Sequence, residues 1–149
     1  VMITFGIENC KINDVDHYVQ NIIEFYNLDE YEADIDIVFK KKCDSDAGGF
    51  CFGDDESVEI EIATHVQGEP LGIKTQLINL AHEMTHAKQL ITGQLQDHGI
   101  QFATAGDCQT LVKVQVWEGE TVTNVAYEDQ PWEIEAFAME REVYDKCFK

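Results

Sequence analysis

The stretch from Leu71 to Thr92 contains the run His82-Glu83-Met84-Thr85-His86, and this part of the chain decides the fold. Apolar residues recur along it with the three- and four-residue spacing of an amphipathic helix. They are Ile73, Leu77, Ile78, Leu80, Ala81, Met84, Ala87, Leu90 and Ile91. The spacing predicts one long helix, and Gly93 directly after it is the kind of residue that ends a helix.

The segments before this helix alternate between strand and helix patterns. Residues 2–7, 33–40 and 57–64 alternate apolar with polar residues and predict strands. Residues 13–28 have helical spacing, with Asn13 as the expected cap. Residues 44–49 are expected to form a loop.

The segments after the long helix predict a hairpin and a last helix. Residues 111–117 and 121–127 resemble two strands joined at Glu118-Gly119-Glu120, and Pro131 is expected to open a helix that runs to about Asp145. The order of elements predicts a single α+β domain over residues 1–149. In it, a small mixed sheet packs on the central helix, with a C-terminal helix beside it.

The composition excludes some classes of partner. The 149 residues carry a net charge of −19, so the chain lacks the basic surface that grips phosphates, and we expect no nucleic-acid partner. No apolar run approaches the roughly 20 residues that span a bilayer, so no membrane partner is expected. The five cysteines are odd in number and form no Cys-x-x-Cys pair, which favours free thiols in a reducing cytoplasm. A Cys43–Cys51 pair or metal site is the less favoured alternative.

The central run has the chemistry of a metal site. His82 and His86 are four residues apart, so both imidazoles lie on one helix face and can share one ion. Glu83 lies about 100° around the helix, where it can reach a water bound to that ion. Apolar neighbours surround the three polar side chains, which are costly to bury without a partner. This pattern predicts one catalytic Zn²⁺ ion, with Glu83 as general base.

Zinc in catalytic sites usually takes three protein ligands and a water, so a third ligand is needed. The last helix offers Glu133 or Glu135, and only one of them can face the ion because they lie about 200° apart. Glu133 shares the more apolar face and is preferred. His98, which follows Gly93, is the other alternative.

Other residues have secondary roles in this interpretation. Tyr127 is expected to stabilise the oxyanion, with Tyr144 and His98 as alternatives. Trp117 and Trp132 are expected to be packing residues, and His17 and His65 to be surface residues. Phe50 and Phe52, next to Gly48-Gly49, are expected to anchor a loop, with lining of a pocket as the alternative.

The run Ala81 to Ala87 resembles the active-site helix of zincin metallopeptidases. Trp117-x-Gly119, Tyr127 and Pro131-Trp132-Glu133-x-Glu135-Ala136 look like small zincin-like proteins often encoded by tailed phages and bacteria. In the gluzincin branch, the third ligand is a glutamate on a later helix, followed three residues on by a small residue. Glu133 with Ala136 has this spacing, and so has Glu135 with Ala138.

In the zincin-like folds that the central run resembles, the strand just before the active-site helix pairs with extended substrate, and the resemblance implies this role for residues 57–64. The glutamates of this strand would favour basic substrates if they face the cleft.

A second resemblance is to SprT-like proteases. His98-Gly99-x-x-Phe102 after the central run is similar to their pattern, in which a third histidine is the ligand. That resemblance implies a DNA-associated protease. The chain has no paired cysteines for the zinc ribbon that such proteases often carry, and its strong negative charge disfavours DNA.

Together, the residues and the resemblance predict a zinc-dependent metallopeptidase that hydrolyses peptide bonds in a peptide or protein substrate. We expect it in the cytoplasm, which is the host cytoplasm if a phage encodes it. A zinc-stabilised binding module without catalysis is the remaining alternative.

Overall fold

A mixed four-stranded sheet is the base of the fold in the computed structural model, which describes residues 2–43, 47–105 and 108–149. Its strands lie in the order β1 (Ile3–Glu8), β2 (Ala33–Lys40), β4 (Ser57–Ala63) and β3 (Gly49–Gly53). The first three are parallel, and β3 runs antiparallel to β4 along the edge of the sheet.

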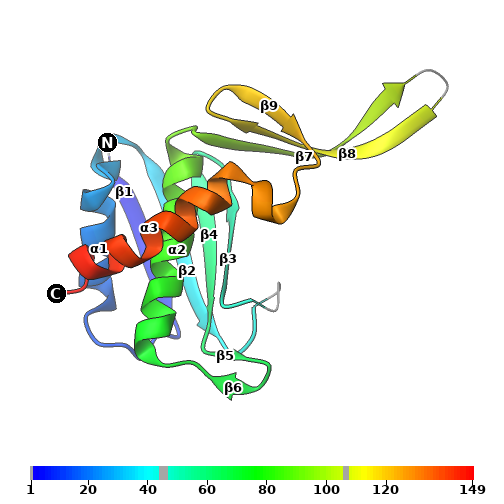
Figure 1. Cartoon of the computed structure of the whole chain (residues 1–149). Helices are drawn as coiled ribbons and strands as arrows, with labels where there is room; N and C mark the ends of the chain where they lie inside the picture. The colour runs from blue at the N-terminus through cyan, green and yellow to red at the C-terminus, as the bar shows by residue number, and fades with distance from the viewer. Residues whose placement is uncertain (1, 44–46, 106–107) are drawn as a thin grey trace.

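The three helices α1 (Val15–Phe25), α2 (Ile73–Ile91) and α3 (Pro131–Cys147) cover one face of this sheet (Figure 1). The alternation predicted for β2 and β4 provides the buried face, because every second side chain points to the helices. The fully buried members include Ile35, Ile37, Val58, Ile60 and Ile62. Burying each such side chain stabilises the fold by roughly 1.5–3 kcal/mol.

Helix α2 lies in the centre, with the sheet on one side and α3 on the other (Figure 1). Its residues Leu80 and Met84 are fully buried, as the helical spacing predicts. The hydroxyl of Tyr18 on α1 donates a hydrogen bond of 2.7 Å to the carbonyl of Leu77, which joins α1 to α2. Gly93 has a φ of 78° and ends α2, as expected.

A second, antiparallel sheet follows α2. It contains β7 (Leu95–Ala105), β8 (Cys108–Trp117) and β9 (Glu120–Thr123), and the β7–β8 ribbon reaches away from the helices (Figure 1). The remaining elements are short: η1 (Leu28–Glu30), β5 (His65–Val66), β6 (Glu69–Pro70) and η2 (Tyr127–Asp129).

The predicted α+β class and the mixed sheet are confirmed, but several details differ. The prediction missed β3, which is short and has glycine at both ends, and β7, whose alternation breaks at a bulge between Asp97 and Ile100. The predicted loop at 44–49 lies partly outside the described residues, and Gly49 belongs to β3. Asn13 does not cap α1, which follows Asp14 without a side-chain cap. The second hairpin strand ends at Thr123, before η2.

In the described part of the chain, no helix has the length and apolar character that crossing a membrane requires. Cys10, Cys51 and Cys147 are free thiols, and the alternative Cys43–Cys51 disulfide is not formed.

Candidate metal centre

Helices α2 and α3 bring His82, His86 and Glu133 together. One ligand atom from each lies within 4.8 Å of the others, and they are the only such group of His, Cys, Asp or Glu among residues 2–43, 47–105 and 108–149. The Nε2 atoms of His82 and His86 each lie 3.0 Å from a different oxygen of the Glu133 carboxylate. This cluster can bind a metal ion.

The outer nitrogen of each imidazole already has a partner. The Nδ1 atom of His82 lies 3.2 Å from a carboxylate oxygen of Glu140, which only accepts hydrogen bonds when ionised. The Nδ1 atom of His86 lies 2.8 Å from the side-chain oxygen of Gln89. In each case Nδ1 is the donor, so Nε2 of the neutral ring carries a lone pair.

With both rings neutral, the inner face of the cluster therefore contains only acceptors. The two Nε2 lone pairs point at the oxygens of Glu133, and acceptors 3.0 Å apart repel each other unless a proton or a cation lies between them. Tetrahedral zinc with ligand bonds of about 2.0–2.1 Å would hold its ligand atoms roughly 3.3 Å apart, close to this spacing. The donor set and its orientation therefore fit a divalent cation.

The pKa shifts of the cluster residues also indicate that the cluster favours a positive charge. Burial alone would raise the pKa of the Glu133 carboxyl, but its contacts with His82 and His86 outweigh burial and lower that pKa to about 2. Burial alone would lower the pKa of His86, but the Glu133 carboxylate outweighs it and raises that pKa. The carboxylate is thus ionised and ready to hold a cation.

Glu83 lies next to the cluster and has a different environment. The residue is only 7% exposed, and its carboxylate forms no hydrogen bond with any described residue. Burial raises the pKa of its carboxyl to about 7, against the opposing effect of the two imidazoles. An ionisable group of this kind has a pKa suited to taking up and releasing a proton near neutral pH.

Strand β3 holds Glu83 in place through a glycine. A Cβ atom built on Gly49 would lie 2.8 Å from both Cγ and Oε2 of Glu83. Any side chain at this position would displace the Glu83 carboxylate or the strand. Sequence reasoning missed Gly49, because the contact joins an unpredicted strand to α2.

Tyr127 stands at the entrance to the cluster. Its hydroxyl donates a hydrogen bond of 3.2 Å to Glu133, and 57% of the residue remains exposed. Burial of the hydroxyl and the nearby Glu133 charge raise the pKa of Tyr127 to about 12, so it keeps its proton. Tyr144 lies elsewhere on α3, packed on Tyr18 and Phe148, and does not line the site.

The cluster opens into a cleft of about 550 Å³. Strand β3 forms one wall, and residues of β7, β8 and the start of α3 form the other, among them Leu95, Asp97, Lys113, Gln115 and Trp132. Phe50 and Phe52 line this cleft from β3, so they belong to a strand rather than anchor a loop.

The strand expected to pair with substrate is not available. Both edges of β4 are already paired, with β2 and with β3, so this expectation for residues 57–64 is wrong. Glu59 is exposed on the open face of the sheet, and Glu61 on the same face pairs with Lys40 at 3.6 Å, so neither faces the cleft. The free edge beside the cluster belongs to β3.

The two alternative third ligands lie outside the cluster. Glu135 accepts hydrogen bonds from Lys88, Gln89 and Gln94, and these outweigh burial and lower its pKa. His98 is exposed on β7 and lines a neighbouring hollow with Asp54 and Asp55. The ligand arrangement that the SprT-like resemblance implies is therefore not the one in this structure.

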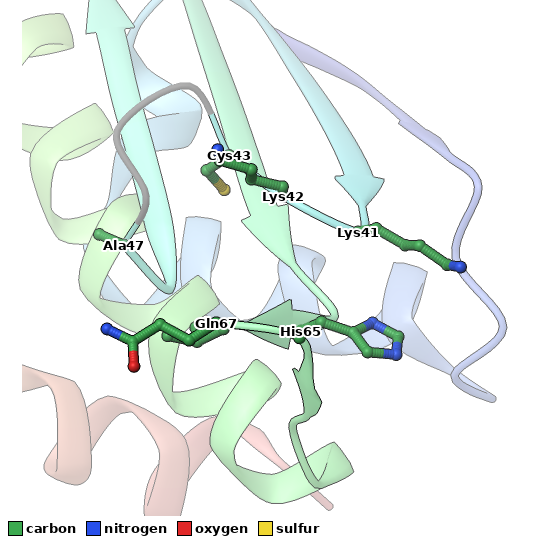
Figure 2. A pocket seen from close by; sticks show the side chains of 8 residues that line it. Lys41, Lys42, Cys43, Ala47, His65 and Gln67 are labelled. Carbon is green, nitrogen blue, oxygen red and sulfur yellow. The ribbon is translucent and has the colours of Figure 1, made fainter.

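The other predicted positions are not among the ligands of the cluster. Trp132 is buried, with its ring centroid 6.2 Å from that of Trp117, and His17 is exposed. His65 is half-buried on β5 and lines a separate hollow with Lys41, Lys42 and Cys43, between the end of β2 and the β5–β6 hairpin (Figure 2).

By fold and site, the chain is an α+β protein with a candidate metal centre of two imidazoles and one carboxylate. No protein-family model, curated protein or solved structure matches it. The interpretation of the site rests on its own geometry and chemistry.

Replacing Glu133 with alanine removes the only carboxylate in the cluster, so metal affinity is expected to fall by more than about 100-fold, which exceeds the loss typical of removing an outer partner of a ligand. His98→Ala should leave affinity unchanged. Equilibrium dialysis of both variants against zinc, followed by elemental analysis, measures this. Loss of zinc from His98→Ala with retention by Glu133→Ala would reverse the assignment.

Proposed function

We propose that the protein is a zinc-dependent metallopeptidase of the zincin-like class, with His82, His86 and Glu133 as ligands and Glu83 as general base. The observation that carries the proposal is the Glu83 carboxylate, which is buried, has no hydrogen-bond partner in the described structure and lies beside the cluster. A purely structural metal site has no need of such a group. Two imidazoles and a carboxylate are a ligand set that suits zinc.

The number of protein ligands, which is three, is the second reason to favour a catalytic site over a structural one. Structural zinc sites are closed by four protein ligands, whereas catalytic sites keep one position open. The cluster provides three ligands from described residues and opens into a cleft. When bound, zinc supplies Lewis acidity, which polarises the scissile carbonyl and lowers the pKa of water to near 7.

The residues of the chain then have distinct tasks. Glu83 accepts a proton from the attacking water and delivers it to the leaving amine, a transfer suited to a carboxyl with a pKa of about 7. Tyr127 keeps its proton, and its hydroxyl can turn from Glu133 to donate to the oxyanion of the substrate.

The free edge of β3 is the proposed binding site for the peptide backbone. An extended peptide can add to such an edge through main-chain hydrogen bonds, which bind sequences of many kinds. The edge borders the cleft beside Glu83, so a peptide added there passes the cluster. This assigns to β3 the role that the sequence suggested for β4.

Glu83→Gln is expected to abolish hydrolysis and leave zinc bound, because glutamine keeps the shape of the side chain and cannot accept the proton. We expect the rate of peptide cleavage to fall by about 10²- to 10⁴-fold, the usual contribution of a general base. Cleavage of a broad peptide library and metal content would be measured on the same samples. A zinc-loaded wild type that cleaves no better than this variant would sink the peptidase proposal.

Gly49→Ala is expected to lower the cleavage rate without removing zinc, because the added methyl group displaces Glu83 and not the ligands. Misplacement of a catalytic group by about 1 Å can cost about 100-fold in rate. The control is Gly6→Ala on β1, where a Cβ meets no atom within 4 Å. Equal rates for the two variants would contradict the role given to Gly49.

The zinc-stabilised binding module remains a second candidate because of Cys51. Its thiol lines the same cleft but lies outside the group of ligand atoms within 4.8 Å of one another, and burial and the charges of Glu83 and Glu133 raise its pKa, which disfavours the thiolate. If a thiolate from Cys51 closed the coordination sphere, the site would be structural.

Cys51→Ser separates the two candidates. The peptidase proposal expects unchanged zinc affinity in this variant, since three ligands remain. The binding module expects the affinity to fall by more than tenfold. Competition with a chromophoric chelator measures the affinity of wild type and variant under the same conditions.

A further inference from the structure

We propose that Gln89 is a positioning residue for His86, and that Glu135 holds Gln89 in place. The inference rests on the metal centre of the proposed function and adds to it the residues that orient one ligand. Its evidence is a continuous set of hydrogen bonds from α3 to the His86 ring.

Gln89 lies on α2 and is completely buried. Its amide nitrogen donates to the carbonyl of Trp132 and to Glu135 Oε1, both at 3.0 Å. Both amide hydrogens therefore have acceptors, and the amide oxygen is left to face His86 Nδ1 at 2.8 Å. Turning the amide over would place its oxygen against two acceptors, the Trp132 carbonyl and the Glu135 carboxylate, so only one orientation is compatible with these neighbours.

The fixed amide decides which nitrogen of His86 carries the hydrogen. Because the Gln89 oxygen only accepts, His86 Nδ1 donates, and Nε2 presents its lone pair to the cluster. Metal-binding histidines commonly have such an outer partner, which sets the ring orientation and strengthens the ligand. Gln89 thus holds the imidazole in the form and direction that a cation requires.

Glu135 is the anchor of this arrangement. In addition to Gln89, its carboxylate accepts from Lys88 at 2.8 Å and from Gln94 at 3.1 Å. Lys88 also donates to the Gln94 side-chain oxygen at 2.7 Å. One carboxylate thereby joins α3, the C-terminal half of α2 and the segment before β7.

The same anchor fixes the rotation of α3. Glu135 lies two residues after Glu133, about 200° around the helix, so the two carboxylates point in different directions. With Glu135 held against the end of α2, Glu133 is turned toward the imidazoles. Glu135, which the sequence offered as the alternative to Glu133, is therefore the residue that orients the site from outside the ligand cluster.

Gln89→Met tests the inference, because methionine fills a similar volume and cannot form the three hydrogen bonds. We expect its zinc dissociation constant to rise about 10- to 100-fold, the usual cost of losing an outer partner. The matched control is Gln76→Met. Gln76 is also buried on α2 and donates to the Leu71 carbonyl at 2.9 Å, but it lies outside the cluster. Its loss should leave zinc affinity within about twofold of wild type.

Two readouts separate positioning from simple packing. Chelator competition gives the zinc dissociation constant, and the absorption spectrum of the Co²⁺-substituted protein reports ligand geometry. We expect both to change in Gln89→Met and neither in Gln76→Met. If Gln89→Met does not fold, Glu135→Gln replaces it, with an expected loss of about tenfold.

Zinc affinity and Co²⁺ spectra equal to wild type in the folded variant would overturn the inference, whatever its stability. Zinc-loaded wild type without peptidase activity would sink the proposed function and leave this inference standing, because affinity is read independently of cleavage. A wild type that binds no zinc would overturn both.

Discussion

The contact between the Glu133 carboxylate and two imidazoles is the interaction on which the rest of the structure depends. It joins α3 to α2 at the position where His82 and His86 converge. The partners of each Nδ1 atom leave lone pairs facing the carboxylate, so the contact is favourable only with positive charge between the rings and the oxygens. A buried arrangement of this kind is stable with a cation and poorly satisfied without one.

The sheet contributes in a different way, by setting the side of the cluster that faces solvent. Strand β3 has no side chain at Gly49, so Glu83 lies directly against the strand. The same strand leaves its outer edge free beside the cleft. The proposed general base on α2 therefore packs against the same short strand that presents the proposed binding edge.

The sequence predicted the parts of the site that lie on one helix. Helical spacing alone places His82, Glu83 and His86 on α2, and helix geometry separates Glu133 from Glu135. The choice between those two glutamates depended on apolar neighbours, and their partners in the structure explain the difference: Glu133 meets imidazoles, and Glu135 meets Lys88, Gln89 and Gln94.

The sequence pattern could not predict the contacts between residues that lie far apart in the chain. The contact of Gly49 with Glu83 depends on a strand with too few residues to show a pattern. Glu140, the outer partner of His82, lies on a helix whose docking is not visible in a linear pattern. A signal for Glu140 was present, since it shares a helical face with Glu133, seven residues earlier. Gln89 lies three residues after His86, a spacing that permits contact on a helix.

Because α2 precedes α3 in the chain, the site has an order of assembly. While the polypeptide is being synthesised, α2 presents two imidazoles long before the third ligand exists. Only when α3 has formed and docked do all three donors meet, so ion capture coincides with the docking of α3. A nascent or misfolded chain in which α3 is undocked retains only a weak two-histidine site, which ties any hydrolytic power to a finished fold.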